Sequence, residues 1–86
     1  MNNKKEKNIT NTPLKLPKEQ VDLVMDLYAT GKINEAIDAI KALNEDYPNV
    51  PLLFNLLGAC YNQLGQFGAA AQFFESAFTI KPDYAE

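Results

Sequence analysis

The chain contains no histidine and no tryptophan, and Cys60 is the single cysteine among its 86 residues. Without histidine, the commonest general base and the commonest metal ligand of proteins are both missing. One cysteine excludes a disulfide within the chain. No apolar run approaches the roughly 20 residues that span a bilayer, and the polar N-terminus lacks the apolar stretch of a secretory signal. We therefore expect a cytoplasmic, non-catalytic chain with no membrane partner and no metal or other cofactor.

Positive charge is scarce outside the N-terminus, and all eight basic residues are lysines. Residues 1–20 carry a local charge of +3, and the remainder carries −6, which together give the net −3. Nucleic-acid binding depends on lysine and arginine to neutralise phosphates, so an acidic domain without arginine indicates no nucleic-acid partner. The length allows one small domain at most. Residues 1–16 are polar and rich in lysine and asparagine, and we predict a disordered or extended tail there.

What the sequence does have is a match to itself at a spacing of 34 residues. Leu23 recurs as Leu57, Gly31 as Gly65, Ala36 as Ala70, and Pro48 as Pro82. Similar pairs lie between them, such as Leu27 with Tyr61 and Ile40 with Phe74. A fixed period of this length is typical of stacked supersecondary units, which usually bind other molecules rather than carry out chemistry.

Each unit reads as two helices joined by a glycine turn. Apolar residues recur at three-to-four spacings from Lys18 onward, and Gly31 supplies the positive φ that ends the first helix. Asn34 is the expected N-cap of the second helix, which Pro48 stops. A third helix is expected from Val50 or Pro51 to Gly65, and a fourth from residue 67 to just before Pro82. Strand patterns are absent, so we predict an all-α fold of two antiparallel helix–turn–helix hairpins.

The second unit resembles the tetratricopeptide repeat. Eight of its residues fall on the positions by which that repeat is recognised: Phe54, Leu57, Gly58, Tyr61, Ala70, Phe74, Ala77 and Pro82. The family often has tryptophan at the place of Phe54. The resemblance implies that Gly58 and Ala70 are small because the two helices cross there at close range. It also implies that Tyr61 and Phe74 fill the space above and below the crossing, and that the hairpins stack as a right-handed solenoid.

The first unit resembles a degenerate version of the same repeat. Gln20 stands at the large aromatic position, Val24 at the glycine and Leu43 at the second alanine. A terminal repeat often departs in this way, because one of its faces has no neighbour. The expected organisation is therefore repeat 1 over residues 17–50, repeat 2 over 51–84, and the start of a further repeat at 85–86.

The end of the chain suggests an array cut at a repeat boundary, so we expect either a fragment of a longer array or an engineered chain. At least about three repeats are usually needed for a stable array. The last helix would leave Ala71, Phe78 and Ile80 without a neighbour, as an exposed apolar patch. We therefore expect homo-oligomers to form through the exposed face of the last helix.

The resemblance places a ligand groove on the first helix of each hairpin. Its inward positions are Lys18, Val21, Met25 and Tyr28 in the first unit, and Leu52, Asn55, Ala59, Asn62 and Gln63 in the second. Asn55 and Asn62 are seven apart on one face and could bind a peptide backbone, or could be solvent-facing amides with no ligand. The apolar members could bind an apolar segment, or could pack against the tail or another copy.

One subgroup of the family binds acidic chaperone tails through a clamp of lysine and asparagine. The matching positions here are Val21, Met25 and Leu56, and none of them fits the clamp. The remaining candidate groups have ordinary interpretations. Cys60 lies mid-helix with no lysine placed to activate it, so we expect a buried, unreactive thiol. Six carboxylates fall on outward helical positions, which predicts a solvated face: Asp22, Asp26, Glu35, Asp38, Glu45 and Asp46.

Three functions remain open at this point. The first is a non-catalytic module that binds a protein or peptide segment. The second is the N-terminal arm of a larger bacterial sulfotransferase or glycosyltransferase, since segments 56–61, 64–66 and 81–83 are similar to arrays that precede such catalytic domains. In that case the arm would position a partner or substrate, and the chemistry would lie outside these residues. The third is a minimal repeat array whose role is folding or self-assembly.

Overall fold

The computed structural model describes residues 16–80, and four α-helices make up most of this part. They are α2 (Lys18–Ala29), α3 (Ile33–Asp46), α4 (Pro51–Gln63) and α5 (Phe67–Thr79). No strand occurs between residues 16 and 80. The all-α prediction is therefore confirmed. The expectations for residues 1–15, for Pro82 and for a further repeat at 85–86 lie outside the described residues.

Glycine and proline set the bounds of the helices. Gly31 and Gly65 adopt φ values of 84° and 78°, which only glycine tolerates without strain, and each follows the end of a helix. Pro51 occupies the first turn of α4, where its missing N–H costs no hydrogen bond. Pro48 follows Tyr47, whose φ of −130° and ψ of 74° lie outside the helical region. These four positions behave as the sequence predicts.

The expected N-cap at Asn34 is wrong. Helix α3 begins at Ile33, its N-cap is Lys32, and no side chain caps it. The turn after Gly31 is short: the Lys32 N–H donates to the Leu27 carbonyl at 2.8 Å, and the Ala36 N–H already donates to the Lys32 carbonyl at 2.9 Å. Because the Lys32 carbonyl accepts the first helical hydrogen bond, Lys32 is the N-cap and Asn34 lies inside the first turn of α3.

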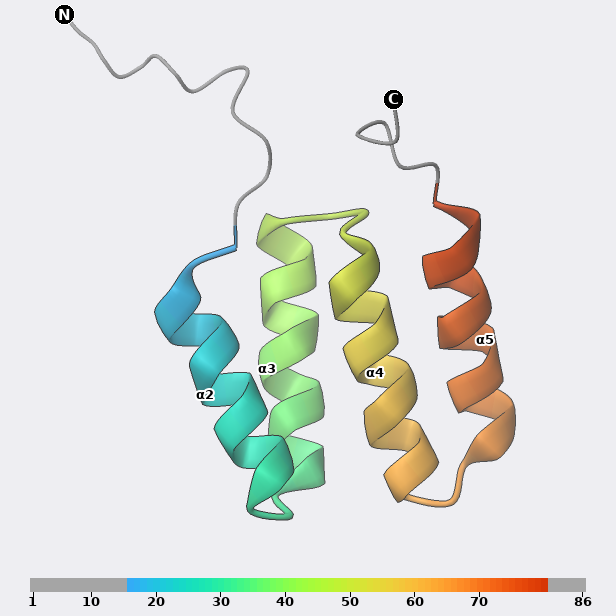
Figure 1. Cartoon of the computed structure of the whole chain (residues 1–86), viewed down its shortest axis with the longest axis horizontal. Helices are drawn as coiled ribbons and strands as arrows, with labels where there is room; N and C mark the ends of the chain where they lie inside the picture. The colour runs from blue at the N-terminus through green and yellow to red at the C-terminus, as the bar shows by residue number, and fades with distance from the viewer. Residues whose placement is uncertain (1–15, 81–86) are drawn as a thin grey trace, which may run out of the picture.

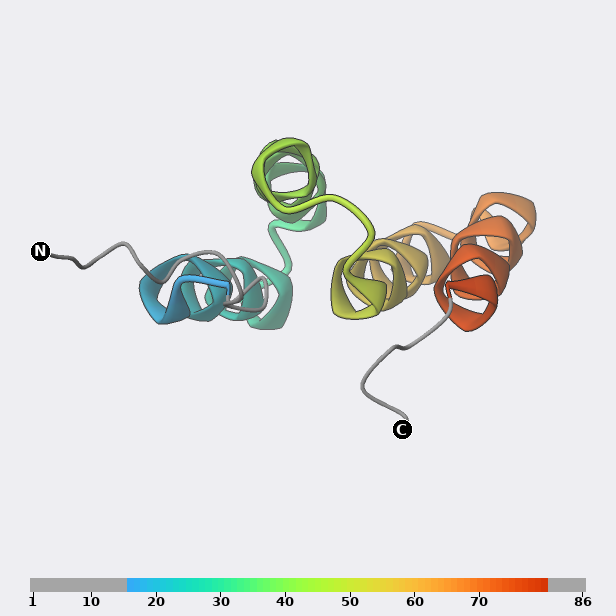
Figure 2. The same cartoon turned by 90° about the horizontal axis from the view of Figure 1, so that it is seen from above.

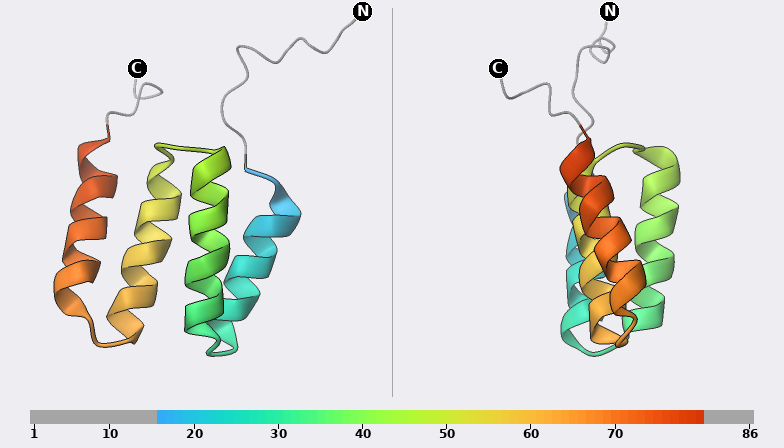
Figure 3. Two further views of the ribbon diagram at one scale, coloured as in Figure 1. Left: turned by 180° about the vertical axis from the view of Figure 1, so that it is seen from behind. Right: turned by 90° about the vertical axis from the view of Figure 1, so that its right-hand side faces the viewer.

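The helices stand side by side in chain order, and neighbours run in opposite directions (Figure 1). Viewed from above, α2 and α4 lie on one side while α3 is displaced to the other (Figure 2). From behind, α5 and α2 form the two ends of the row (Figure 3). Each helix packs against its neighbours in the chain, α2 with α3, α3 with α4, and α4 with α5. This packing is consistent with stacked hairpins and makes α3 and α4 the interior helices.

The core lies between α2, α3 and α4. Its members are Val24, Ala36, Ile37, Ile40, Leu43, Leu53, Leu57 and Cys60, all nearly inaccessible to solvent. Leu16, just before α2, packs against this cluster, so the last residue of the expected tail belongs to the packed part of the chain. Helix α5 contributes differently: its buried residues are Ala70 and Ala77. The larger apolar residues of α5 therefore lie mostly outside the core.

Aromatic rings join α4 to α5. Phe73 stacks on Tyr61 with ring centroids 5.3 Å apart and on Phe54 at 6.3 Å. A Cβ on Gly58 would lie 2.6 Å from a ring carbon of Phe74, so the close approach expected at Gly58 is confirmed. The close neighbour, however, is the Phe74 ring and not the backbone of α5. The sequence pattern did not single out Phe73, which does the filling beside Tyr61 that was expected of Phe74.

Candidate interaction surfaces

The predicted groove residues form one face on each of two helices. Lys18, Val21, Met25 and Tyr28 recur at three-to-four spacings along α2, and the other five recur in the same way along α4: Leu52, Asn55, Ala59, Asn62 and Gln63. Helices α2 and α4 run in the same direction and lie on the same side of α3 (Figures 1 and 2). We call these nine residues the α2–α4 face.

One hydrogen bond joins the two helices of this face. The Gln63 Nε2 donates to the Tyr28 Oη at 3.3 Å, between residues 35 apart in the chain. This separation of 35 residues is one more than the 34-residue period, so the bond joins nearly equivalent positions of the two repeats. In the 34-residue repeat, Met25 corresponds to Ala59, and Val21 to Asn55. Gln63 already has a partner in the fold, which makes it a positioning residue of the face.

The charge on this face is already paired. The Lys18 ammonium contacts the Asp22 carboxylate at 2.8 Å, one turn along α2. The hydrogen bond and the charge of Asp22 raise the pKa of Lys18. Both side chains are exposed, so the pair has little effect on stability. Because Asp22 neutralises it, Lys18 is a poor receptor for an acidic ligand.

The rest of the α2–α4 face combines apolar side chains with amides. Met25 and Leu52 are among the exposed large hydrophobic residues, while Val21, Tyr28 and Ala59 are partly buried. Asn55 and Asn62 are exposed and seven residues apart. The face can therefore contact an apolar side chain of a ligand and offer hydrogen bonds to its backbone.

Helix α5 carries a second surface, which is more apolar. The predicted patch consists of Ala71, Phe78 and Ile80; the first two are exposed, and Ile80 is partly buried after the helix end. Sequence reasoning missed Phe67 and Phe74, which are exposed as well. With Ala71 and Phe78 they follow a spacing of four, three and four residues, which is a single helix face. That spacing was readable in the sequence, but Phe74 was assigned to the hairpin interior.

Reactive groups are not gathered anywhere in residues 16–80. Within this part of the chain no cluster of three or more histidine, cysteine, aspartate or glutamate residues could hold a metal ion. All six carboxylates predicted on the solvated face are exposed, which confirms that interpretation. Cys60 is buried as expected, and burial raises the pKa of its thiol, so the thiol is neutral at pH 7.

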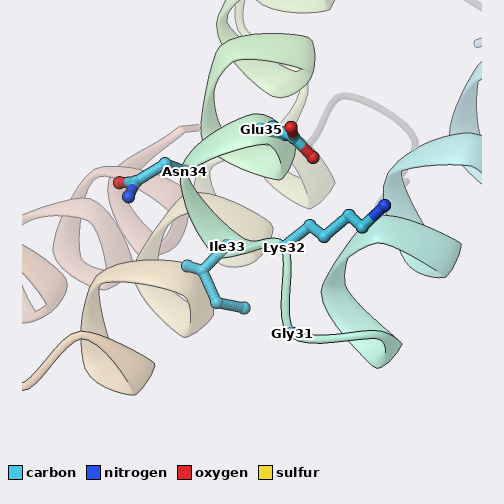
Figure 4. A pocket seen from close by; sticks show the side chains of 5 residues that line it. All are labelled: Gly31, Lys32, Ile33, Asn34 and Glu35. Carbon is cyan, nitrogen blue, oxygen red and sulfur yellow. The ribbon is translucent and has the colours of Figure 1, made fainter.

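A shallow hollow of about 270 Å³ lies at the turn between α2 and α3. Five consecutive residues from Gly31 to Glu35 line it, and none of them belongs to the α2–α4 face. Their side chains diverge: Asn34 points away from the side on which Lys32 and Glu35 lie (Figure 4). Since no polar groups converge in the hollow, it does not have the features of a ligand site.

Comparison of the chain with models of protein families, with curated proteins and with solved structures finds no match. Within the helices described here, none is both long enough and apolar enough to cross a membrane. The functional conclusion therefore depends on the two surfaces described above, the α2–α4 face and the exposed face of α5.

Proposed function

We propose that this chain is a non-catalytic protein-interaction module of the tetratricopeptide type, whose α2–α4 face binds a protein or peptide segment. The observation that carries the proposal is the hydrogen bond by which Gln63 of α4 donates to Tyr28 of α2, since it joins the two helices of the face. In the 34-residue repeat, apolar Val21 and Met25 of α2 correspond to Asn55 and Ala59 of α4. A segment lying along the face would meet an apolar row on one helix and backbone-binding amides on the other.

The ligand best suited to this face is a short segment with apolar side chains and no strong acidic charge. Seven carboxylates lie on α2 and α3, and Lys18 is already neutralised, so an acidic segment would be repelled. Nucleic acid is disfavoured for the same reason. We propose a cytoplasmic location together with this function.

Selection from a random peptide display library tests the α2–α4 face and identifies a ligand in the same experiment. The enriched peptides are measured against the full chain and against the variants Met25→Glu and Asn62→Ala, with helicity followed by circular dichroism. We expect Met25→Glu to weaken binding by about tenfold or more, since it places a charge in the apolar contact. Glu45→Gln, on the exposed side of α3, is the matched control and should bind as the unchanged chain does.

If no apolar peptide is enriched, or if Met25→Glu and Asn62→Ala both bind normally, the proposed use of this face is wrong. Peptides that instead lose binding on Phe78→Asp would place the interaction on α5.

We also propose that the chain self-associates through the exposed face of α5. Large apolar side chains exposed together are typical of association surfaces. Phe67 and Phe78 are the most exposed of the large apolar residues in the described part of the chain. A strict monomer at millimolar concentration in light scattering would contradict this second proposal and leave the first untouched.

A further inference from the structure

The exposed face of α5 has an equivalent on α3, 34 residues earlier in the chain, where the same face is packed inside the fold. Phe67, Ala71, Phe74 and Phe78 form what we call the aromatic stripe. The residues 34 positions earlier, on α3, are Ile33, Ile37, Ile40 and Asn44. In α3, which packs between α2 and α4, Ile37 and Ile40 are only 5% and 0% exposed, whereas Phe67, Phe74 and Phe78 on the end helix α5 are 65%, 41% and 88% exposed. A helix packed on α5 would bury the stripe in the same way.

The chain's own α2 cannot be that helix in a second copy. The residues of α4 that share the core cluster with α3 are Leu53, Leu57 and Cys60. Their counterparts on α2 are Glu19, Leu23 and Asp26, all exposed. Packing α2 of one copy on α5 of another would bury two carboxylates against phenylalanine rings, with no cation on α5 to pair with them. The head-to-tail arrangement, which would continue the row indefinitely, is therefore disfavoured.

The distribution of charge favours contact between two α5 helices instead. Residues 51–80 contain one charged side chain, Glu75, whereas residues 16–50 contain three lysines and seven carboxylates. Because α2 and α5 are the two ends of the row (Figure 3), an α5–α5 contact keeps the acidic hairpins at opposite ends of the assembly. The aromatic stripe itself carries no charge. Two copies can thus approach through α5 with little electrostatic repulsion.

We propose that two copies of this chain form a closed, two-fold symmetric dimer in which the aromatic stripes of the two α5 helices pack on each other. The inference rests on the self-association proposed above and specifies its geometry and its end point. The same surface is used on both copies, so the interface is satisfied at two chains and no filament grows. Ala71 is the one small residue of the stripe and lies near its middle, which lets the helices approach closely at the two-fold axis.

The mass of the full chain in solution tests the stoichiometry. Sedimentation equilibrium should give twice the chain mass of 9.6 kDa at high concentration, with no larger species. Phe78→Asp should weaken dimerisation by about 100-fold or more, because each dimer loses two buried rings. Leu23→Asp, on the outer face of α2, is the matched control and should dimerise normally. Circular dichroism of both variants checks that the helices are retained.

Cross-linking tests the symmetry. Under mild oxidation, Ala71→Cys should form a covalent dimer, because a residue near a two-fold axis meets its own copy within disulfide reach. Leu23→Cys should form none. A mass that keeps growing with concentration, or a cross-link that requires cysteines at both Ala71 and Leu23, would overturn the symmetric dimer while retaining self-association. A monomer at every concentration would overturn self-association itself.

Discussion

The two hairpins have the same plan but different surroundings. The α2–α3 hairpin carries three lysines and seven carboxylates across residues 16–50, and its second helix buries Ala36, Ile37, Ile40 and Leu43. The α4–α5 hairpin carries one charge across residues 51–80, and its last helix buries two alanines while exposing three phenylalanines. The comparison shows that the 34-residue pattern encodes the hairpin, whereas the neighbouring helix decides whether a given face is buried.

Leu23 and Leu57 show this most clearly. The two leucines occupy the same position 34 residues apart, yet Leu23 is 52% exposed and Leu57 is 2% exposed. Helix α3 precedes α4 and contributes to the core around Leu57, whereas no helix of the described part precedes α2. The carboxylates beside Leu23 are suited to an end that faces solvent. One end of the row is therefore polar and the other apolar.

Replacing the two leucines should give the largest difference between the hairpins. We expect Leu57→Ala to lower the free energy of unfolding by about 2–5 kcal/mol, because it opens a cavity in the core. Leu23→Ala should lower it by less than about 1 kcal/mol, since the side chain is half exposed. Urea denaturation followed by circular dichroism measures both. Equal losses for the two variants would mean that the hairpins are not packed as described.

Exchanging packing pairs between the hairpins tests whether they are equivalent. The second hairpin uses Gly58 with the ring of Phe74, where the first uses Val24 and Ile40, both buried. Gly58→Val alone should destabilise the fold by about 1–3 kcal/mol, because its Cβ meets the Phe74 ring. Combining it with Phe74→Ile should recover about 0.5 kcal/mol or more. If the double variant loses as much free energy of unfolding as the two single variants added together, the two pairs fill different spaces.

The glycine turns should respond alike in the two hairpins. Gly31 and Gly65 have positive φ values and no atom within 4 Å of the place where a Cβ would be. Alanine at either position should therefore lower the free energy of unfolding by about 1–2 kcal/mol, through backbone strain alone. Thermal or urea unfolding of Gly31→Ala and Gly65→Ala gives the two values. A difference of several-fold between them would contradict the similarity of the turns.

The smallest expected effect is a dependence of stability on pH. Burial raises the pKa of the Cys60 thiol in the folded chain, whereas in the unfolded chain it titrates near about 8.5. The folded state then holds the proton more tightly, so stability is complete below the unfolded pKa and falls as the pH rises toward the folded one. Urea titrations from about pH 7 to pH 9.5 should show this fall. In Cys60→Ala it should vanish; an unchanged slope would assign the effect to other groups.

The sequence predicted the features that depend on local chemistry. The glycine turns, the proline boundaries and the buried apolar face of α3 all follow from periodicity and backbone preference. Features that depend on a neighbour were not predictable from the pattern. Phe73 and Phe74 are adjacent and identical, so composition could not tell which ring stacks on Tyr61 and which one lies exposed. The predicted cap at Asn34 is wrong because α3 starts earlier, with the Lys32 carbonyl accepting the first helical hydrogen bond.

For the two candidate surfaces as well, some features were predictable from the sequence and others required the structure. The register of α2 and α4 follows from the repeat, but the Tyr28–Gln63 hydrogen bond required coordinates, because it joins side chains whose separation is one residue more than the period. Ala71 and Phe78 were found from their place on an end helix. Phe67 and Phe74 were not, because their exposure depends on the absence of a helix beyond α5 in the described part of the chain.

Hydrogen–deuterium exchange of the full chain at two concentrations tests the difference between the ends most directly. On moving from about 10 μM to about 1 mM, the amides of α5 should gain protection, because the aromatic stripe becomes buried between two copies. The amides of α2 should exchange as before. Equal gains in protection at both ends, or a gain confined to α2, would contradict the claim that the chain associates through α5 while α2 stays in solvent.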